Sequence, residues 1–358
     1  AASRIDGGLM RLSRRRMMGA GTGLLLASVL PAVRARTLDA RDFGVRGDGV
    51  SDDTRALQAA IDALPAGGTL ALGPGNYVID PERSLRLRSR TRLSMAPDTR
   101  LIARANAAPR TYVLLLEGVH DVQVSGGRIV GDRDHHRSNA GEWGHGIMVR
   151  GAEQVLLRDL HITRCWGDGI SIGGISGARV VPSRDIRIED VVCAGNRRQG
   201  LTIGRSRHVR VLRSHFLATH GTLPGCGIDI EPDPGDGAED IGIEACTLRG
   251  NHGAGLQVYE RGRRIAVRRC VIRGNRGDGV LIRGGEQCVI EDNDIADNGL
   301  RGIVVRGGGH DITVAGNRFS GNAAGLRKRR PQAMKGWMHV DVAKSATRVR
   351  VERNNRFE

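Results

Sequence analysis

Seven short segments of this 358-residue chain repeat one pattern, a Gly followed by alternating aliphatic residues. The steps from one Gly to the next are 23, 31, 27, 28, 24 and 23 residues. Such a period is typical of a solenoid, in which each repeat forms one coil and contacts only its neighbours. The pattern therefore predicts stacked coils, with insertions in the longer ones. The seven glycines are Gly146, Gly169, Gly200, Gly227, Gly255, Gly279 and Gly302.

The residues after each Gly alternate, and alternation with a period of two indicates a β-strand. The first and third residues after the Gly are aliphatic in all seven repeats, so we expect them to point into a common core. The second and fourth residues then point outward. The first inward column holds Ile147, Ile170, Leu201, Ile228, Leu256, Val280 and Ile303. The second holds Val149, Ile172, Ile203, Ile230, Val258, Ile282 and Val305.

Small and polar residues recur at fixed places between these strands. Stacked Asn side chains can hydrogen-bond from one coil to the next and satisfy backbone groups there. Cys246 and Cys270 fall on adjacent coils, at a spacing that a disulfide can span. They occupy the small-residue slot of an internal ladder, however, which favours free and buried cysteines. The recurring asparagines are Asn196, Asn251, Asn275, Asn298 and Asn322.

A second motif precedes the repeats, where residues 41–64 read RDFGVRGDGVSDDTRALQAAIDAL. Asp52, Asp53 and Thr54 are helix-capping residues, and apolar residues follow them at helical spacing until Pro65. This stretch resembles the N-terminal cap of pectate-lyase-like and polygalacturonase-like right-handed β-helix proteins. The resemblance implies an all-β fold, a right-handed parallel β-helix with a short N-terminal capping helix. It implies little about chemistry, because several enzyme classes and phage tailspikes share the fold.

We expect one β-helix domain at residues 36–358, with the N-terminal cap at 36–80, coils at 81–326 and a C-terminal coil or cap at 327–358. Before it, residues 13–18 read SRRRMM and precede a short apolar stretch. Residues 1–35 resemble a twin-arginine signal peptide. The apolar stretch is short for a membrane-spanning helix. We therefore expect a periplasmic or secreted protein without a stable membrane anchor.

The chain is basic, with 55 Lys and Arg against 39 Asp and Glu and a formal charge of +16. Such an excess suggests an acidic partner. Nucleic acid is not expected, because aromatic residues for base stacking are not interleaved with the basic runs. An acidic, uronate-containing polysaccharide fits both the charge and the implied fold, and we expect a monomer to bind it.

An acidic run interrupts this basic chain at residues 225–237, which read GCGIDIEPDPGDG. Asp229 and Glu231 flank inward Ile230, so both carboxylates are predicted to point outward into solvent from one strand. Residues two apart on a strand stand about 6.6 Å apart, at the lower edge of the separations of inverting glycosidases. The run therefore predicts a catalytic pair, with Glu231 as general acid and Asp229 as general base.

Residues near this pair are candidates for substrate binding. An exposed Trp beside a groove is a plausible platform for a sugar ring, and arginines can hold a uronate carboxylate. Arg side chains on later coils, at positions 283 and 306, are expected to flank the acidic pair with positive charge. The candidate binding residues are Trp143, His145, Asp168, Arg197, Arg198, Gln199, His220, Asp233 and Tyr259.

The catalytic motifs of the related families are incomplete. The polygalacturonase-like NTD triad, paired DD and RIK segments are missing, and DIEPD departs from the DPHD-type signature of mannuronan epimerases. Three functions therefore stay open: a glycoside hydrolase, a polysaccharide lyase or uronate epimerase, and a non-catalytic glycan-binding β-helix. A hydrolase needs no cofactor and we expect no metal site, whereas in a lyase Arg198 or a calcium ion would neutralise the uronate carboxylate.

Overall fold

The structure, a computed structural model, describes residues 36–177, 180–323 and 339–358. By its internal contacts the chain divides into Ala1–Arg34 and Ala35–Glu358, and the fold is that of the second unit. The predicted twin-arginine signal lies outside the described residues. Within them, no helix has both the length and the hydropathy needed to cross a membrane.

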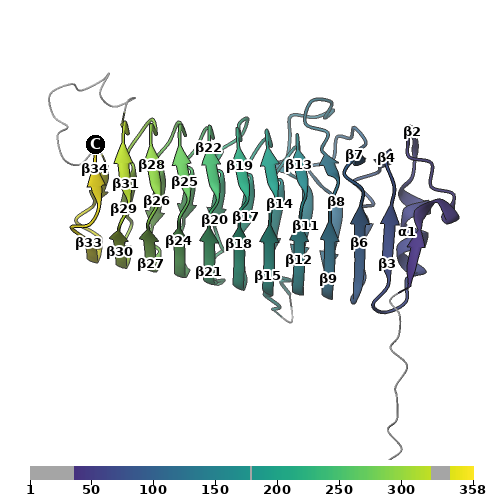
Figure 1. Ribbon diagram of the computed structural model, residues 1–358, viewed down its shortest axis with the longest axis horizontal. Coiled ribbons are helices and arrows are strands. Elements are labelled where there is room, and N and C mark those ends of the chain that lie inside the picture. Colours follow the sequence, from purple (N-terminus) through teal and green to yellow (C-terminus); the bar gives the residue numbers. More distant parts are fainter. Residues whose placement is uncertain (1–35, 178–179, 324–338) are drawn as a thin grey trace, which may run out of the picture. The chain divides into compact units, whose positions relative to one another are not determined.

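Three parallel sheets, named A, B and C, build the fold, and their strands follow one another in chain order (Figure 1). The predicted right-handed parallel β-helix is thereby confirmed. Sheet A contains β1 (Thr37–Asp39), β3 (Thr69–Leu72), β6 (Thr91–Met95), β9 (His120–Ser125), β12 (Glu153–Arg158), β15 (Ser183–Glu189), β18 (Ser206–Leu212), β21 (Ala238–Glu244), β24 (Gly262–Arg268), β27 (Glu286–Glu291), β30 (His310–Ala315) and β33 (Thr347–Val351). Sheet B contains β2 (Asp48–Asp52), β4 (Gly75–Ile79), β7 (Thr99–Ala103), β10 (Arg128–Val130), β13 (His161–Thr163), β16 (Val192–Ala194), β19 (His215–Leu217), β22 (Thr247–Arg249), β25 (Val271–Arg273), β28 (Asp294–Ala296), β31 (Arg318–Ser320) and β34 (Arg356–Phe357). Sheet C contains β5 (Leu85–Arg86), β8 (Arg110–Glu117), β11 (Trp143–Arg150), β14 (Ile170–Gly173), β17 (Leu201–Ile203), β20 (Ile228–Ile230), β23 (Leu256–Val258), β26 (Val280–Arg283), β29 (Ile303–Arg306) and β32 (Val340–Val342).

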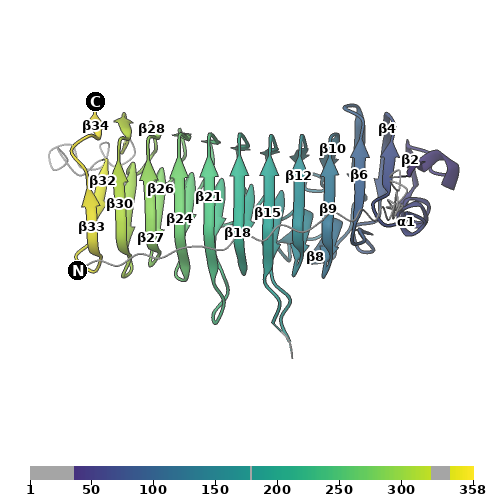
Figure 2. The same ribbon diagram turned by 60° about the horizontal axis from the view of Figure 1, so that its bottom comes forward.

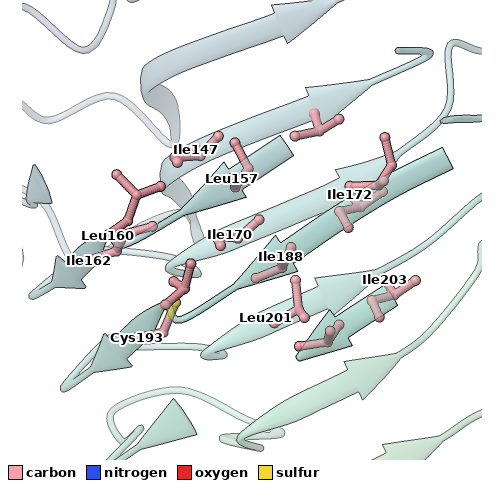
Figure 3. Packing of buried hydrophobic residues seen from close by; sticks show 14 of the residues in the cluster. Ile147, Leu157, Leu160, Ile162, Ile170, Ile172, Ile188, Cys193, Leu201 and Ile203 are labelled. Atoms are coloured by element: carbon pink, nitrogen blue, oxygen red, sulfur yellow. The ribbon is translucent and has the colours of Figure 1, made fainter. Parts of the chain in front are cut away.

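Sheet C carries the predicted columns in the predicted register. Ile170 pairs with Ile147 on one side and with Leu201 on the other, and the pairing continues without a shift to the last repeat. Figure 3 shows these side chains beside inward-facing residues of the other sheets, such as Leu157 and Ile162. All of them are buried. Burying one such aliphatic side chain contributes about 1.5–3 kcal/mol, and the repeat makes this contribution again at every coil.

The predicted asparagine ladder is also present. Asn275 accepts a hydrogen bond from Asn251 Nδ2 at 2.9 Å and donates through its own Nδ2 to Asn298 Oδ1 at 2.9 Å. The same amide group donates to the backbone carbonyl of Leu248 at 3.0 Å. All six cysteines are buried and free, which confirms the prediction made for Cys246 and Cys270.

The capping helix α1 (Thr54–Asp62) follows a short 3-10 helix, η1 (Ala40–Phe43). Leu57 and Ile61 on its inner face are buried in the core. Asp53 accepts the backbone N–H groups of residues 46 and 47 at 2.7 and 3.0 Å, and thereby closes the turn before the helix. Strands β1 and β2 already belong to sheets A and B, so the sheets begin inside the segment predicted as a cap.

Among the connections from sheet C to sheet A, those before β15 and before β21 are the longest, and both project beyond the strand ends in Figure 2. An isolated antiparallel bridge joins Ile175 to Val181 within the first loop. The second loop contains the acidic residues Asp233 and Asp236. Each loop connects sheet C to sheet A, and therefore begins where the outward columns of sheet C end.

Candidate functional site

The outer face of sheet C carries a cavity of about 400 Å³, which we call the groove. Residues on or next to five successive strands, β8, β11, β14, β17 and β20, line it, and the loops before β15 and β21 contribute further residues. Its lining is mainly polar and charged. The charged residues are Arg110, Glu142, Arg150, Asp168, Arg198, Arg205, Glu231, Asp233 and Asp236.

Arg198 lies between three of these carboxylates. Its Nη1 is 3.3 Å from Asp168 Oδ2, its Nη2 is 3.2 Å from Glu231 Oε2, and its Nε is 3.7 Å from Glu142 Oε2. Burial by itself would lower the pKa of Arg198, but the three carboxylates raise it above its ordinary value. The guanidinium group therefore keeps its charge and joins side chains from several coils.

Glu142 and Glu231 are the members of this cluster that reach solvent. Each side chain is 36% exposed, whereas Asp168 is fully buried. Glu231 follows β20, where the sequence predicted it, and Glu142 immediately precedes β11. A polymer lying in the groove can therefore contact both carboxylates.

Asp229 points away from the core, as predicted, but it does not reach solvent. Its side chain is completely buried under neighbours from the coils on either side. Gln199 Nε2 donates to one carboxyl oxygen at 2.8 Å, and Gln257 Nε2 donates to the other at 3.2 Å. Burial raises the pKa of Asp229 well above its usual range, and the Glu231 carboxylate raises it further. The prediction that Asp229 faces solvent is wrong, because the amide side chains of Gln257, next to it in its column, and of Gln199, which precedes β17, cover its carboxyl group.

The burial of Asp229 leads to a prediction for Asp229→Asn. A carboxyl group whose pKa is raised by folding keeps its proton after the unfolded chain, with a pKa of about 3.9, has lost it. In the parent protein, the free energy of unfolding therefore falls as the pH rises from the pKa of the unfolded chain to the raised pKa of the folded state. The variant has no titrating group at this position, so its free energy of unfolding does not show this fall. We expect the free energy of unfolding of the variant, relative to the parent, to increase from about pH 4 to about pH 8. Denaturant titrations at the two pH values measure this difference.

Turnover separates this role of Asp229 from a catalytic one. The variant should keep turnover within about twofold, because the side chain does not reach the groove. A loss of a hundredfold or more, the scale expected for a general acid or base, would restore the predicted catalytic role of Asp229 if the variant folds normally.

A second group of groove residues lies on β8 and β11, which are neighbouring strands of sheet C. His145 Nδ1 accepts the backbone N–H of Asp168 at 3.0 Å, and the imidazole stacks on Tyr112 with ring centroids 5.7 Å apart. Burial lowers the pKa of His145, and only the nearby Asp168 opposes this effect. The ring is therefore neutral at neutral pH and carries its proton on Nε2, from which it can donate a hydrogen bond.

Several predicted binding residues lie outside the groove. Gln199 is buried beneath it, where its Oε1 accepts the backbone N–H of Cys226 at 2.8 Å. Arg197 stacks on the ring of Trp166 at 3.8 Å. His220 lies near His252, with ring centroids 5.2 Å apart, beside the asparagine ladder. Tyr259 follows β23 and lies under the guanidinium of an arginine from the next coil. The groove does bring together Trp143, His145, Asp168, Arg198, Glu231 and Asp233.

The arginines that supply positive charge to the groove also differ from those predicted. Arg283 and Arg306, which were expected to flank the acidic pair, lie on β26 and β29 and do not line the groove. Inside the groove, Arg205 forms an ion pair with Asp236, and Arg150 forms one with a glutamate of β8. From Glu231 the groove extends toward the N-terminal coils. Most of the arginines and carboxylates that line it form ion pairs.

Sequence reasoning missed Arg110, Tyr112, Glu142 and Arg205. The first two lie on β8, which belongs to a coil before the first Gly of the repeat, so no marker aligned them with the later columns. Glu142 is the sequence neighbour of the candidate Trp143, but the length of its loop alone could not show that it lies next to Arg198. Among the described residues, no three His, Cys, Asp or Glu side chains gather as metal ligands do, and we assign no ligands to calcium.

Comparisons with known families agree with this fold. Residues 37–123 match the family described as rhamnogalacturonase A/epimerase, pectate lyase-like. Residues 235–355 match the family described as right handed beta helix region. These matches confirm the predicted resemblance to pectate-lyase-like right-handed β-helix proteins.

Similar proteins cover several kinds of β-helix. The uncharacterized protein YclG of Bacillus subtilis is 29% identical over 246 residues, which are 61% of this chain and 42% of YclG. The A-module of the mannuronan C-5 epimerase AlgE6 from Azotobacter vinelandii has a TM-score of 0.59 at 18% identity, and the match covers 89% of this chain and 99% of the module. The Dettilon tailspike protein has a TM-score of 0.65 at 16% identity, with 79% and 55% covered. The chain spans less than half of YclG, and the likeness to the two solved structures shows the fold alone.

Proposed function

We propose that this pectate-lyase-like β-helix is an exported, polysaccharide-active enzyme that hydrolyses glycosidic bonds in an acidic, uronate-containing polysaccharide. The observation that carries the proposal is the pair Glu142 and Glu231, two half-exposed carboxylates in contact with the largely buried guanidinium group of Arg198. Because both carboxylates contact the same guanidinium group, an oxygen of Glu142 and an oxygen of Glu231 lie within about 9.5 Å of each other, the upper limit for the carboxylate pairs of glycosidases. Hydrolysis needs such a pair, one carboxyl for each side of the scissile bond.

Glu231 is assigned the role of general base or nucleophile. Arg198 Nη2 lies 3.2 Å from its carboxylate and fixes its orientation by a charge-assisted hydrogen bond. Glu142 is assigned the role of general acid, because its contact with Arg198 is longer, at 3.7 Å. In this assignment Glu142 protonates the leaving oxygen while Glu231 takes a proton from water or attacks the sugar.

The remaining groove residues are assigned to substrate binding. His145 Nε2 donates a hydrogen bond to a sugar hydroxyl, and Trp143, 40% exposed, offers an apolar surface on which a sugar ring can stack. The fold shared with the A-module of a mannuronan epimerase is compatible with an acidic polysaccharide. A twin-arginine signal in residues 1–35 would deliver the folded protein to the periplasm or outside the cell, where we expect it to act as a monomer.

A lyase or epimerase is the second candidate function. The observation that favours it is Tyr112, which stacks on His145 and shares the groove with Arg198, because these reactions need a proton acceptor, here the phenolate oxygen, and a cation near a uronate carboxylate. The shared fold of the Dettilon tailspike protein keeps a third candidate open, a β-helix that binds glycans without turning them over.

The test is a product assay on polygalacturonate and alginate, with dextran as the neutral polymer. We expect new reducing ends from an acidic polymer, without the near-ultraviolet absorbance of unsaturated uronates. Absorbance would instead establish a lyase, and inverted uronates detected by NMR would establish an epimerase. Binding to either acidic polymer without any product would contradict an enzymatic role.

A further inference from the structure

Arg110 and Trp143 lie side by side on two neighbouring strands at one end of the groove. They are register partners on β8 and β11, and the Arg110 guanidinium carbon lies 4.9 Å from the centre of the Trp143 ring. Both side chains are exposed, and both line the groove. A cation and an apolar ring are therefore presented together at one place on the surface.

Arg110 differs from the other three arginines of the groove. Arg150, Arg198 and Arg205 each form an ion pair with at least one carboxylate. Arg110 has no carboxylate within ion-pair distance among the residues that the structure describes. The charges of the three paired arginines are locally neutralised, so Arg110 carries the positive charge that is available to a ligand.

We propose that Arg110 and Trp143 form a separate subsite that binds an anionic sugar unit, a uronate or a sulfated sugar, of the polymer held in the groove. The exposed part of the indole stacks on the C–H face of the ring. The guanidinium accommodates the carboxylate or sulfate through two parallel hydrogen bonds. The inference rests on the proposed function for its substrate, but it concerns recognition and not bond cleavage.

The position of the subsite separates it from Glu231, whereas Glu142 directly precedes Trp143 and lies beside the subsite. Strands β11, β14, β17 and β20 are consecutive in sheet C. Three intervals of about 4.8 Å place the strand of Trp143 roughly 14 Å from the strand that precedes Glu231. The sugar unit at Trp143 and the unit at Glu231 are therefore different units of one chain.

The test compares Arg110→Gln with Arg184→Gln, a control that removes an exposed arginine from β15 on sheet A. Calorimetry at low salt measures binding of polygalacturonate, of the same polymer with its carboxyl groups reduced, and of dextran sulfate against dextran. We expect Arg110→Gln to weaken binding of an anionic polymer at least tenfold and to leave its neutral counterpart unaffected, whereas Arg184→Gln changes neither. Trp143→Ala should weaken binding of charged and neutral polymers alike.

The two anionic polymers distinguish a carboxylate ligand from a sulfate ligand. Equal binding of all polymers by Arg110→Gln and the parent would overturn the proposal, and so would failure of every anionic polymer to bind the parent. Arg110→Lys, which keeps the charge but not the paired hydrogen bonds, should show an intermediate loss. Charge-selective binding that depends on Arg110, in a protein that releases no reducing ends, would support the subsite and contradict the proposed hydrolase.

Discussion

Replacing Glu231 by Gln is expected to lower turnover by roughly 10²–10⁴-fold, the contribution of a positioned general acid or base. The carboxylate is the half-exposed member of the acidic strand and lies 3.2 Å from Arg198 Nη2. Gln has nearly the same shape and keeps a hydrogen-bonding oxygen for Arg198, but it can neither accept a proton nor attack a sugar. Initial rates on the polymer identified by the product assay, together with the melting temperature, measure the effect.

Two further variants make this result interpretable. Glu142→Gln should give a loss of similar size if Glu142 is the general acid, and the two losses should not add fully because the residues act in one step. Glu153→Gln, which removes an exposed carboxylate from β12, should leave the rate unchanged. A Glu231→Gln protein that keeps more than about a tenth of the parental rate would contradict the assigned role.

Replacing Arg198 by Ala is expected to destabilise the fold by about 3–5 kcal/mol, the usual cost of removing one partner from a buried ion pair. Asp168 is completely buried, and Arg198 is the cation within ion-pair distance of it among the described residues. Of the side chains that the structure describes, the Thr202 hydroxyl would then be the hydrogen-bond donor left to its carboxylate. Glu142 and Glu231 would also lose the group that holds them together, so turnover should fall at the same time. Denaturant unfolding and initial rates measure the two effects.

The effect on stability distinguishes this role from simple substrate binding. An arginine that only held substrate would raise the Michaelis constant and leave the unfolding free energy unchanged. Arg184→Ala, at an exposed position on sheet A, provides the matched control and should change the stability by less than about 0.5 kcal/mol. If the Arg198→Ala variant unfolds at the same denaturant concentration as the parent, the prediction that Arg198 stabilises the buried cluster is wrong.

The fold and its core could be predicted from the sequence because they depend on local and periodic information. A side chain's direction alternates along each strand, and the Gly column sets the register from coil to coil, so Ile147, Ile170 and Leu201 had to share one inward column. The asparagine ladder followed from the same period, since the same residue type at the same place in successive coils becomes a stack. The position of Glu231 at the end of its strand was predicted for the same reason.

Exposure and neighbourhood on the outer face were decided only by the tertiary structure. Alternation predicts that Asp229 and Glu231 both point outward, but the amides of Gln199 and Gln257 cover the first, and the second stays half-exposed. Contacts across several coils, such as that between Glu142 and Arg198, depend on where an irregular loop returns to the sheet. A periodic pattern specifies the direction of a side chain from the core, because every coil repeats the same backbone. It does not specify what lies above that side chain, because the covering groups are long, non-repeating and separated by about 30 residues or more along the chain.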